Sequence, residues 1–123
     1  MLEINSLNVF HGPIQAGQDI DMIVSEGQCV TLLGPNGAGK TSTLSAITGT
    51  ARATGSIRLG GDQIAHMLVD DRSRRGLAIS PEGRRVFANL SVRENLIMGG
   101  ALYNSKAQLS AKIEQWFVQF PTL

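Results

Sequence analysis

Apolar and polar residues alternate along two stretches near the N-terminus, at residues 2–10 and residues 20–24. A period of two is the pattern of a strand that has one buried and one exposed face. The tripeptide His-Gly-Pro at residues 11–13 is typical of a turn. We therefore predict two half-buried strands with a turn after the first, and a further short strand at residues 56–59, before Gly60-Gly61.

Two other stretches are apolar without alternation. Cys29–Leu33 is almost continuously apolar and stops at Gly34-Pro35, which is typical of a strand buried on both faces in a parallel sheet. Leu77–Ile79 predicts another short strand. Within the first of these strands, Cys29 is expected to be a small core residue.

Three helices are predicted from the spacing of apolar residues and from capping residues. The first covers residues 40–47 and ends at Gly49. Ser91 and Glu94 have the spacing of a capping box, in which each side chain bonds to the other residue's backbone N–H, so a helix is predicted over residues 92–98. Ser105 begins the last helix, which stops before Pro121 and carries one apolar stripe: Leu109, Ile113, Trp116, Phe117 and Phe120.

The composition excludes several classes of protein. The chain has 123 residues, of which 42% are hydrophobic, and this is enough for a compact domain with a core. Its single cysteine excludes a disulfide framework and fits a reducing cytoplasm. The start, Met-Leu-Glu, lacks a basic residue, so we expect no secretion signal. No apolar stretch approaches the ~20 residues that a transmembrane helix needs.

Charge is distributed unevenly although the net charge is only +1. Lys40 is the first basic residue, and every charged residue before it is acidic. Six arginines lie between residues 72 and 93, with Glu82 as the only acid among them: Arg72, Arg74, Arg75, Arg84, Arg85 and Arg93. Such a cluster fits either nucleic acid or an acidic partner, or a solvated face.

The clearest chemical motif is the stretch Gly34–Thr41, which fits G-x-x-x-x-G-K-[ST] between a predicted strand and a predicted helix. Its glycines let several backbone N–H groups face one phosphate, Lys40 supplies a positive charge, and the Thr41 hydroxyl is a Mg²⁺ ligand. The alternative is a glycine-rich turn that happens to carry Lys-Thr. The predicted nucleotide-binding residues are Gly34, Pro35, Asn36, Gly37, Ala38, Gly39, Lys40, Thr41 and Ser42.

Gly34–Ser42 resembles the Walker A loop of ABC transporter ATPases, and residues 81–96 resemble their Q-loop region and the helix after it. The form Pro-Glu-Gly-Arg-Arg at residues 81–85, with Glu in place of Gln, is similar to one ATP-binding subunit of branched-chain amino acid uptake systems. The resemblance covers nearly the whole chain. It implies an α/β fold, a truncated P-loop NTPase core of the ABC type, with a P-loop core and antiparallel β portion at residues 1–80 and the Q-loop region and start of a helical subdomain at 81–123.

The same resemblance implies an ATP-binding component of an importer for branched-chain amino acids. ATP and Mg²⁺ would be its cofactors, and membrane permease subunits and a second ATP-binding subunit its partners, on the cytoplasmic face of the plasma membrane. No nucleic-acid partner is implied. The alternatives are a non-catalytic ATP-binding fragment, the ATP-binding subunit of a urea or amide importer, and a nucleic-acid-associated P-loop protein that uses the arginine cluster.

Two further site residues follow from the resemblance. The family stacks an aromatic ring on adenine from the end of the first strand, where His11 and Phe10 are both candidates, and His11 is the predicted contact. Ala16-Gly17 stands where a large apolar residue is usual, which implies a weaker contact there. Glu82 occupies the Q-loop position and is the predicted second metal ligand; the alternative is a loop carboxylate that offsets Arg84 and Arg85.

Other motifs of the family are missing from the 123 residues. There is no Leu-Ser-Gly-Gly-Gln-type motif, no convincing Walker B strand, no catalytic Glu and no switch His, so we expect no catalytic residue and leave ATPase activity open. The chain resembles the N-terminal half of such a subunit. Met67–Asp71 imitates a Walker B strand, but we interpret Asp70 and Asp71 as polar residues at the end of a helix that leads into a loop at residues 72–75.

Overall fold

A computed structural model of the chain describes residues 1–83, 85–103 and 105–123. The chain divides into two compact units, Met1–Ile79 and Ser80–Leu123. Each unit has its own secondary structure and its own apolar contacts, and each is described by itself.

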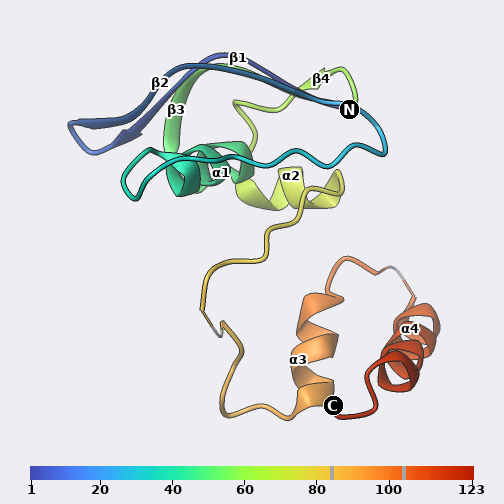
Figure 1. Cartoon of the computed structure of the whole chain (residues 1–123). Helices are drawn as coiled ribbons and strands as arrows, with labels where there is room; N and C mark the ends of the chain where they lie inside the picture. The colour runs from blue at the N-terminus through green and yellow to red at the C-terminus, as the bar shows by residue number, and fades with distance from the viewer. Residues whose placement is uncertain (84, 104) are drawn as a thin grey trace. The chain divides into compact units, whose positions relative to one another are not determined.

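The first unit is built on an antiparallel sheet with the strand order β2-β1-β3-β4 (Figure 1). The strands are β1 (Leu2–His11), β2 (Ile14–Val24), β3 (Arg52–Leu59) and the short β4 (Asp62–Gln63). Strands β1 and β2 form a hairpin in which Leu2 pairs with Val24 and His11 with Ile14. The three predictions from alternation and turn residues are therefore confirmed, and β2 and β3 both begin several residues before the predicted stretches.

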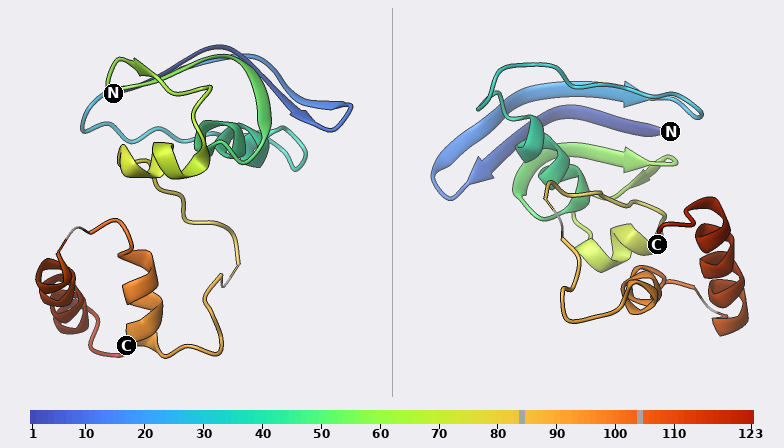
Figure 2. Two further views of the ribbon diagram at one scale, coloured as in Figure 1. Left: turned by 180° about the vertical axis from the view of Figure 1, so that it is seen from behind. Right: turned by 60° about the horizontal axis from the view of Figure 1, so that its bottom comes forward.

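The core of this unit lies between one face of the sheet and helix α1 (Lys40–Thr48), which crosses that face (Figure 2). Alternate residues of β1 and β3 supply one side of the core and the inner face of α1 the other. Helix α2 (Val69–Arg74) follows β4 and contacts α1. The buried core residues are Ile4, Leu7, Val9, Ala46, Ile47, Ile57 and Ile64.

Residues 29–33 and 77–79 do not form strands, and both predictions are wrong. Cys29 is exposed instead of lying in the core, and Leu33 is 88% exposed. A strand buried on both faces needs hydrogen-bonded neighbours at both of its edges, and among the described residues neither segment belongs to a sheet. Apolar side chains of the two segments line a groove of about 220 Å³ together with side chains of β1, β2 and α1.

The second unit is a pair of helices, α3 (Val92–Gly99) and α4 (Lys106–Gln119), as predicted. Arg93 joins them, because its Nη2 lies 2.5 Å from Glu114 Oε1 and its guanidinium lies 5.2 Å from the centre of the Phe117 ring. The apolar stripe of α4 is only partly covered: Ile113 is buried, whereas Trp116 keeps a substantial exposed area.

A capping box begins α3, as the sequence predicts. The Ser91 hydroxyl accepts a hydrogen bond from the Glu94 N–H, and the Glu94 carboxylate accepts bonds from the Ser91 hydroxyl at 2.7 Å and from the Ser91 N–H at 2.8 Å. These bonds hold the pKa of Glu94 below its usual range, although the side chain is exposed to solvent. At the start of α4 the Ser105 side chain accepts a bond from the Gln108 N–H in the same way.

We predict that Ser91→Ala destabilises the second unit by about 1 kcal/mol, the usual cost of a lost N-cap. Because the folded-state pKa of Glu94 is lowered, its contribution is present above the unfolded-state pKa and is lost as pH falls through the folded-state pKa. The difference between wild type and Ser91→Ala should therefore shrink on acidification. Unfolding followed by the fluorescence of Trp116, the only tryptophan, measures it. Equal differences at neutral and strongly acidic pH would contradict this account.

Candidate functional site

The predicted phosphate-binding loop, residues 34–41, leads from an irregular segment into α1. Gly37 and Gly39 have φ angles of 85° and 81°, in the left-handed region that favours glycine. Gly39 is the N-cap residue of α1, and a Cβ atom at this position would lie 2.3 Å from the Ala16 carbonyl oxygen of β2. The path of the loop into the helix is therefore fixed by a backbone contact with β2 that only glycine permits.

The side chain of Lys40 turns back toward the start of the loop. Its Nζ donates hydrogen bonds to the carbonyl oxygens of Gly34 and Pro35, each at 2.8 Å. The ion pairs formed by the described residues do not include Lys40, so its charge is held by neutral carbonyls only. A positive charge that lies within a loop and has no carboxylate partner can bind an anion.

The start of α1 adds to this positive potential. No acidic residue occurs in its first turn, and Gly39 provides no side-chain cap. The N–H groups at the start of a helix have no partner within the helix, and the helix dipole is positive at this end. Thr41 is exposed in the same turn. The geometry of the loop, Lys40 and the helix start can therefore hold a phosphate group and present a hydroxyl beside it.

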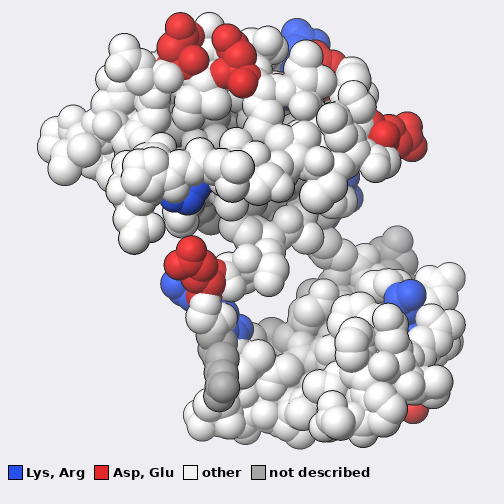
Figure 3. All heavy atoms as spheres, viewed as in Figure 1, with Lys and Arg blue, Asp and Glu red and all other residues white. Residues whose placement is uncertain are grey.

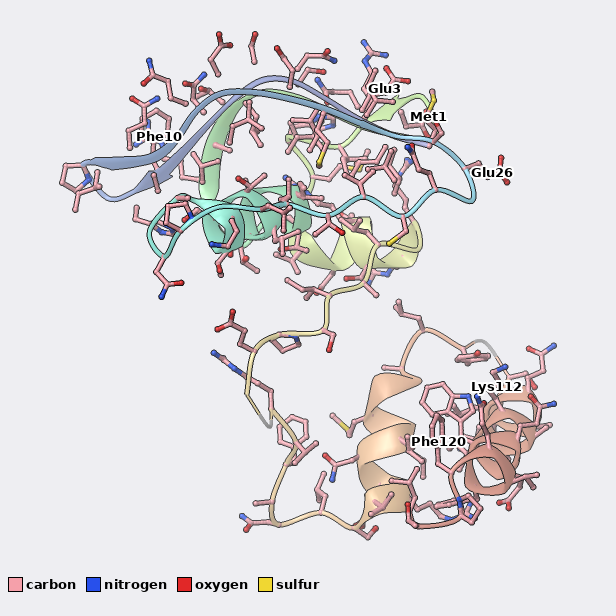
Figure 4. The ribbon with its side chains drawn as sticks, in the orientation of Figure 1. Met1, Glu3, Phe10, Glu26, Lys112 and Phe120 are labelled. Carbon is pink, nitrogen blue, oxygen red and sulfur yellow. The ribbon has the colours of Figure 1, made fainter. Side chains whose placement is uncertain are left out.

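His11 lies beside this turn. It is the last residue of β1, and its Nε2 is 3.0 Å from the Ser42 Oγ. Phe10, near the turn end of the β1–β2 hairpin (Figure 4), faces a different neighbour, because the Arg52 guanidinium lies 5.9 Å from its ring centre. Of the two candidates for the adenine contact, the structure thus brings His11 to the first turn of α1, at Ser42.

An open cavity of about 350 Å³ lies between β2 and the loop. It is mainly polar and is lined by residues 15–18 and Ile20 of β2, together with Gly37 and Ala38. No large apolar side chain occupies the Ala16-Gly17 position, where the carbonyl of Ala16 instead meets the loop. The cavity next to these glycines can therefore hold a part of a ligand beyond its phosphates.

Glu82, the predicted second metal ligand, belongs to the second unit. Its backbone carbonyl accepts a hydrogen bond from Arg85 Nε at 3.4 Å. Arg84, its other predicted neighbour, lies outside the described residues. The role of Glu82 as a metal ligand therefore stays a prediction.

Three of the six arginines in the cluster form ion pairs with acids. Arg74 and Arg75 pair with acids of the first unit, Asp71 and Asp62, and Arg93 pairs with Glu114 of the second. Within each unit, the Lys and Arg side chains on the face seen in Figure 3 are separated by uncharged surface, and some lie beside acidic side chains. Because these ion pairs use much of the positive charge, the cluster gives little support to a nucleic-acid surface.

Arg72 was expected in this cluster as a loop residue, and that expectation is wrong. It lies within α2 and is only 4% exposed, with its guanidinium bonded to backbone carbonyls. Sequence reasoning missed it because a run of arginines contains no signal that separates a buried member from its solvated neighbours.

Asp70 and Asp71 also differ from the prediction. They occupy the first turn of α2 instead of the end of a helix. Carboxylates in a first turn are stabilised by the positive end of the helix dipole, and Asp71 additionally bonds to Arg74 at 2.9 Å. Among the described residues, no group of three or more His, Cys, Asp and Glu side chains gathers around a point where a metal ion could bind.

Comparison with known proteins agrees with this arrangement. The family model of the ABC transporters matches residues 17–122. The chain therefore belongs to the ABC transporter family, and its fold is that of an ABC-type P-loop ATPase core, as predicted.

Three relatives describe its position within the family. The chain is 38% identical over 124 residues to the high-affinity branched-chain amino acid transport ATP-binding protein BraG of Pseudomonas aeruginosa, covering 100% of this chain and 53% of BraG. It is 32% identical over 124 residues to a probable branched-chain amino acid transport ATP-binding protein, LivF, of Archaeoglobus fulgidus, covering 100% of this chain and 52% of LivF. The lipopolysaccharide export system ATP-binding protein LptB of Escherichia coli is 38% identical over 96 residues, or 77% of this chain and 39% of LptB.

A solved structure of an ATP-binding subunit of an ABC transporter matches with a TM-score of 0.81 and 27% identity, covering 98% of this chain and 50% of that one. The chain thus spans about half the length of the proteins that it matches. None of the helices in the described part of the chain has the length and apolar character needed to cross a membrane.

We predict that Gly39→Ala destabilises the first unit more than Gly37→Ala does. Both substitutions cost about 1–2 kcal/mol because alanine must adopt a left-handed conformation. Only the Gly39 variant also forces a methyl group against the Ala16 carbonyl, since nothing lies within 4 Å of a Cβ atom at Gly37. Urea unfolding followed by circular dichroism measures the two effects, and equal midpoints would refute the proposed contact with β2.

Proposed function

We propose that residues 34–41 bind the phosphates of ATP together with Mg²⁺, and that the chain acts as an ATP-binding component in the uptake of branched-chain amino acids. The main support is Lys40: its ammonium group is surrounded by loop carbonyls instead of a carboxylate, at the positive end of a helix that has no acid in its first turn. An anion such as a triphosphate would neutralise the ammonium charge and interact favourably with the positive end of the helix.

The residues present fit both ligands. The left-handed glycines of the loop bring its backbone close to a phosphate without a side chain in the way. Lys40, which bonds to the Gly34 and Pro35 carbonyls, would exchange these bonds for bonds to phosphate oxygens, and the exposed Thr41 hydroxyl would be a hard oxygen ligand that suits Mg²⁺. When bound, Mg²⁺ neutralises charge on the phosphates. Glu82 is proposed as a further oxygen ligand.

His11 is the proposed contact for adenine. Its bond to Ser42 uses the edge of the imidazole ring, at Nε2, and the residue is exposed. The ring can therefore stack on a base through one of its faces without losing that bond. The bond also fixes the ring beside the loop, in the same unit as the adjoining polar cavity.

The transport role is proposed from the relatives. BraG and LivF are both named for branched-chain amino acid transport, and both match over the full length of this chain. LptB matches a shorter stretch and is named for lipopolysaccharide export. We accordingly propose an importer of branched-chain amino acids, with membrane permease subunits and a second ATP-binding subunit as partners, at the cytoplasmic face of the plasma membrane.

We predict that Mg-ATP raises the free energy of unfolding, by about 2.7 kcal/mol at a ligand concentration of one hundred times Kd. Lys40→Ala should lose most of this gain, because the charge that faces the phosphates is removed. Lys112→Ala is the matched control, since Lys112 lies on α4 of the second unit and should leave the gain unchanged. A wild-type unfolding midpoint that does not move in millimolar Mg-ATP would exclude the proposed function.

The partner is tested separately, by capture on membrane vesicles. Vesicles that contain permease subunits of a branched-chain amino acid uptake system should retain the chain, and vesicles that contain permease subunits of a lipopolysaccharide exporter should not. Arg85→Glu should weaken retention severalfold without changing Mg-ATP affinity, because Arg85 belongs to the segment that resembles the Q-loop region. Lys112→Glu is the control for charge. Equal retention by both kinds of vesicle would contradict the proposed partner.

A further inference from the structure

The Arg72 guanidinium is buried without a carboxylate partner among the described ion pairs. Within the described part of the chain, its hydrogen bonds all go to backbone carbonyls: Nη1 donates to Ala46 at 2.7 Å and Ile47 at 2.8 Å, Nη2 to Ala65 at 2.8 Å, and Nε to Met67 at 3.1 Å. Burial lowers the pKa of Arg72, but an arginine still carries its charge at neutral pH. A buried charge this costly needs a structural or functional reason.

Two of these carbonyls belong to the last turn of α1, the helix that begins at Lys40. Carbonyls in the last turn of a helix have no partner within it, and the helix dipole is negative at this end. The guanidinium therefore satisfies the Ile47 carbonyl, adds a second donor to the Ala46 carbonyl, which also accepts from the Gly49 N–H, and neutralises their partial charge. Its other two bonds go to the segment between β4 and α2. One side chain therefore links the end of α1 to the segment that leads into α2.

Gly49 provides the space for this contact. It ends α1 with a φ of 86°, and a Cβ atom there would lie 3.0 Å from both Cζ and Nε of Arg72. The left-handed backbone therefore favours glycine at this position, and a side chain here would press against the guanidinium. The turn after α1 is therefore in close contact with the Arg72 side chain, in addition to the hydrogen bonds.

We propose that Arg72 is a positioning residue for the phosphate-binding loop, acting through α1. It fixes the C-terminal end of a nine-residue helix whose other end carries Lys40 and Thr41. A helix of this length is a rigid rod of about 13 Å, so a displacement at one end is passed to the other. Gly39 keeps the N-terminal end against β2, and Arg72 sets how far along its axis the helix lies. The inference rests on the proposed binding of ATP.

Lysine cannot take over this role. The guanidinium is a planar fork whose separate nitrogens reach carbonyls on two segments at once, whereas an ammonium group is a single point with three donors. Arg72→Lys keeps the charge and loses the fork. The rival explanation is that Arg72 only stabilises the fold, which would lower the unfolding midpoint without changing how well the folded protein binds ATP.

The test compares Arg72→Lys with Arg75→Lys in the full chain. Arg75 is the control, because it belongs to the same segment but pairs at the surface with Asp62. Affinity for Mg-ATP is measured by calorimetry at a temperature at which circular dichroism shows each variant to be folded. Amide hydrogen exchange of residues 43–46, the first amides of α1 with partners within the helix, is measured on the same samples. We expect Arg72→Lys to weaken binding about tenfold to a hundredfold and to speed exchange at these amides, with Arg75→Lys unchanged in both.

Each outcome decides the question. If wild type does not bind Mg-ATP, the proposed function fails. If wild type binds and folded Arg72→Lys binds equally well, the role is only structural and the inference is overturned. If Arg72→Lys does not fold, Gly49→Ala replaces it, because the added methyl group displaces the guanidinium without removing it. Weaker binding by that variant supports the inference; unchanged binding, or failure of both variants to fold, overturns it.

Discussion

The position of helix α1 depends on a close contact between two backbones. At Gly39 the loop turns into the helix with a left-handed residue, and it does so against the carbonyl of Ala16, leaving no room for a side chain. The opposite end of the helix is closed by Gly49, around the guanidinium of Arg72. Between these points Ala46 and Ile47 pack into the core. The helix that presents Lys40 is thus held at both ends and along one face.

This arrangement explains how a small sheet supports a site for a highly charged ligand. The sheet supplies the surface against which α1 packs, and the β1–β2 hairpin supplies both His11 and the carbonyl that meets Gly39. Among the other basic residues of the first unit, Arg74 and Arg75 pair with acids and Arg72 is buried. Lys40 is bonded to neutral carbonyls alone, so its charge is not compensated before a ligand arrives.

Membership of the ABC transporter family and the match to an ATP-binding subunit give this site its context. The chain spans about half the length of those proteins. Residues 29–33 and 77–79 are apolar but unpaired in the described structure, and together with their neighbours they line an open groove. Unpaired apolar segments cost free energy in water. The open groove therefore lowers the stability of the first unit.

The sequence by itself determined the local features. Alternation predicted β1, β2 and β3, the capping box predicted α3, and the apolar spacing over residues 40–47 with Gly49 predicted α1, because each signal is contained within a few neighbouring residues. Tertiary structure decided the rest. Whether an apolar run becomes a strand depends on partners distant in sequence, which is why residues 29–33 and 77–79 were predicted wrongly. Arg72 was buried, and His11 joined to Ser42, by elements far along the chain, and no local pattern encodes such contacts.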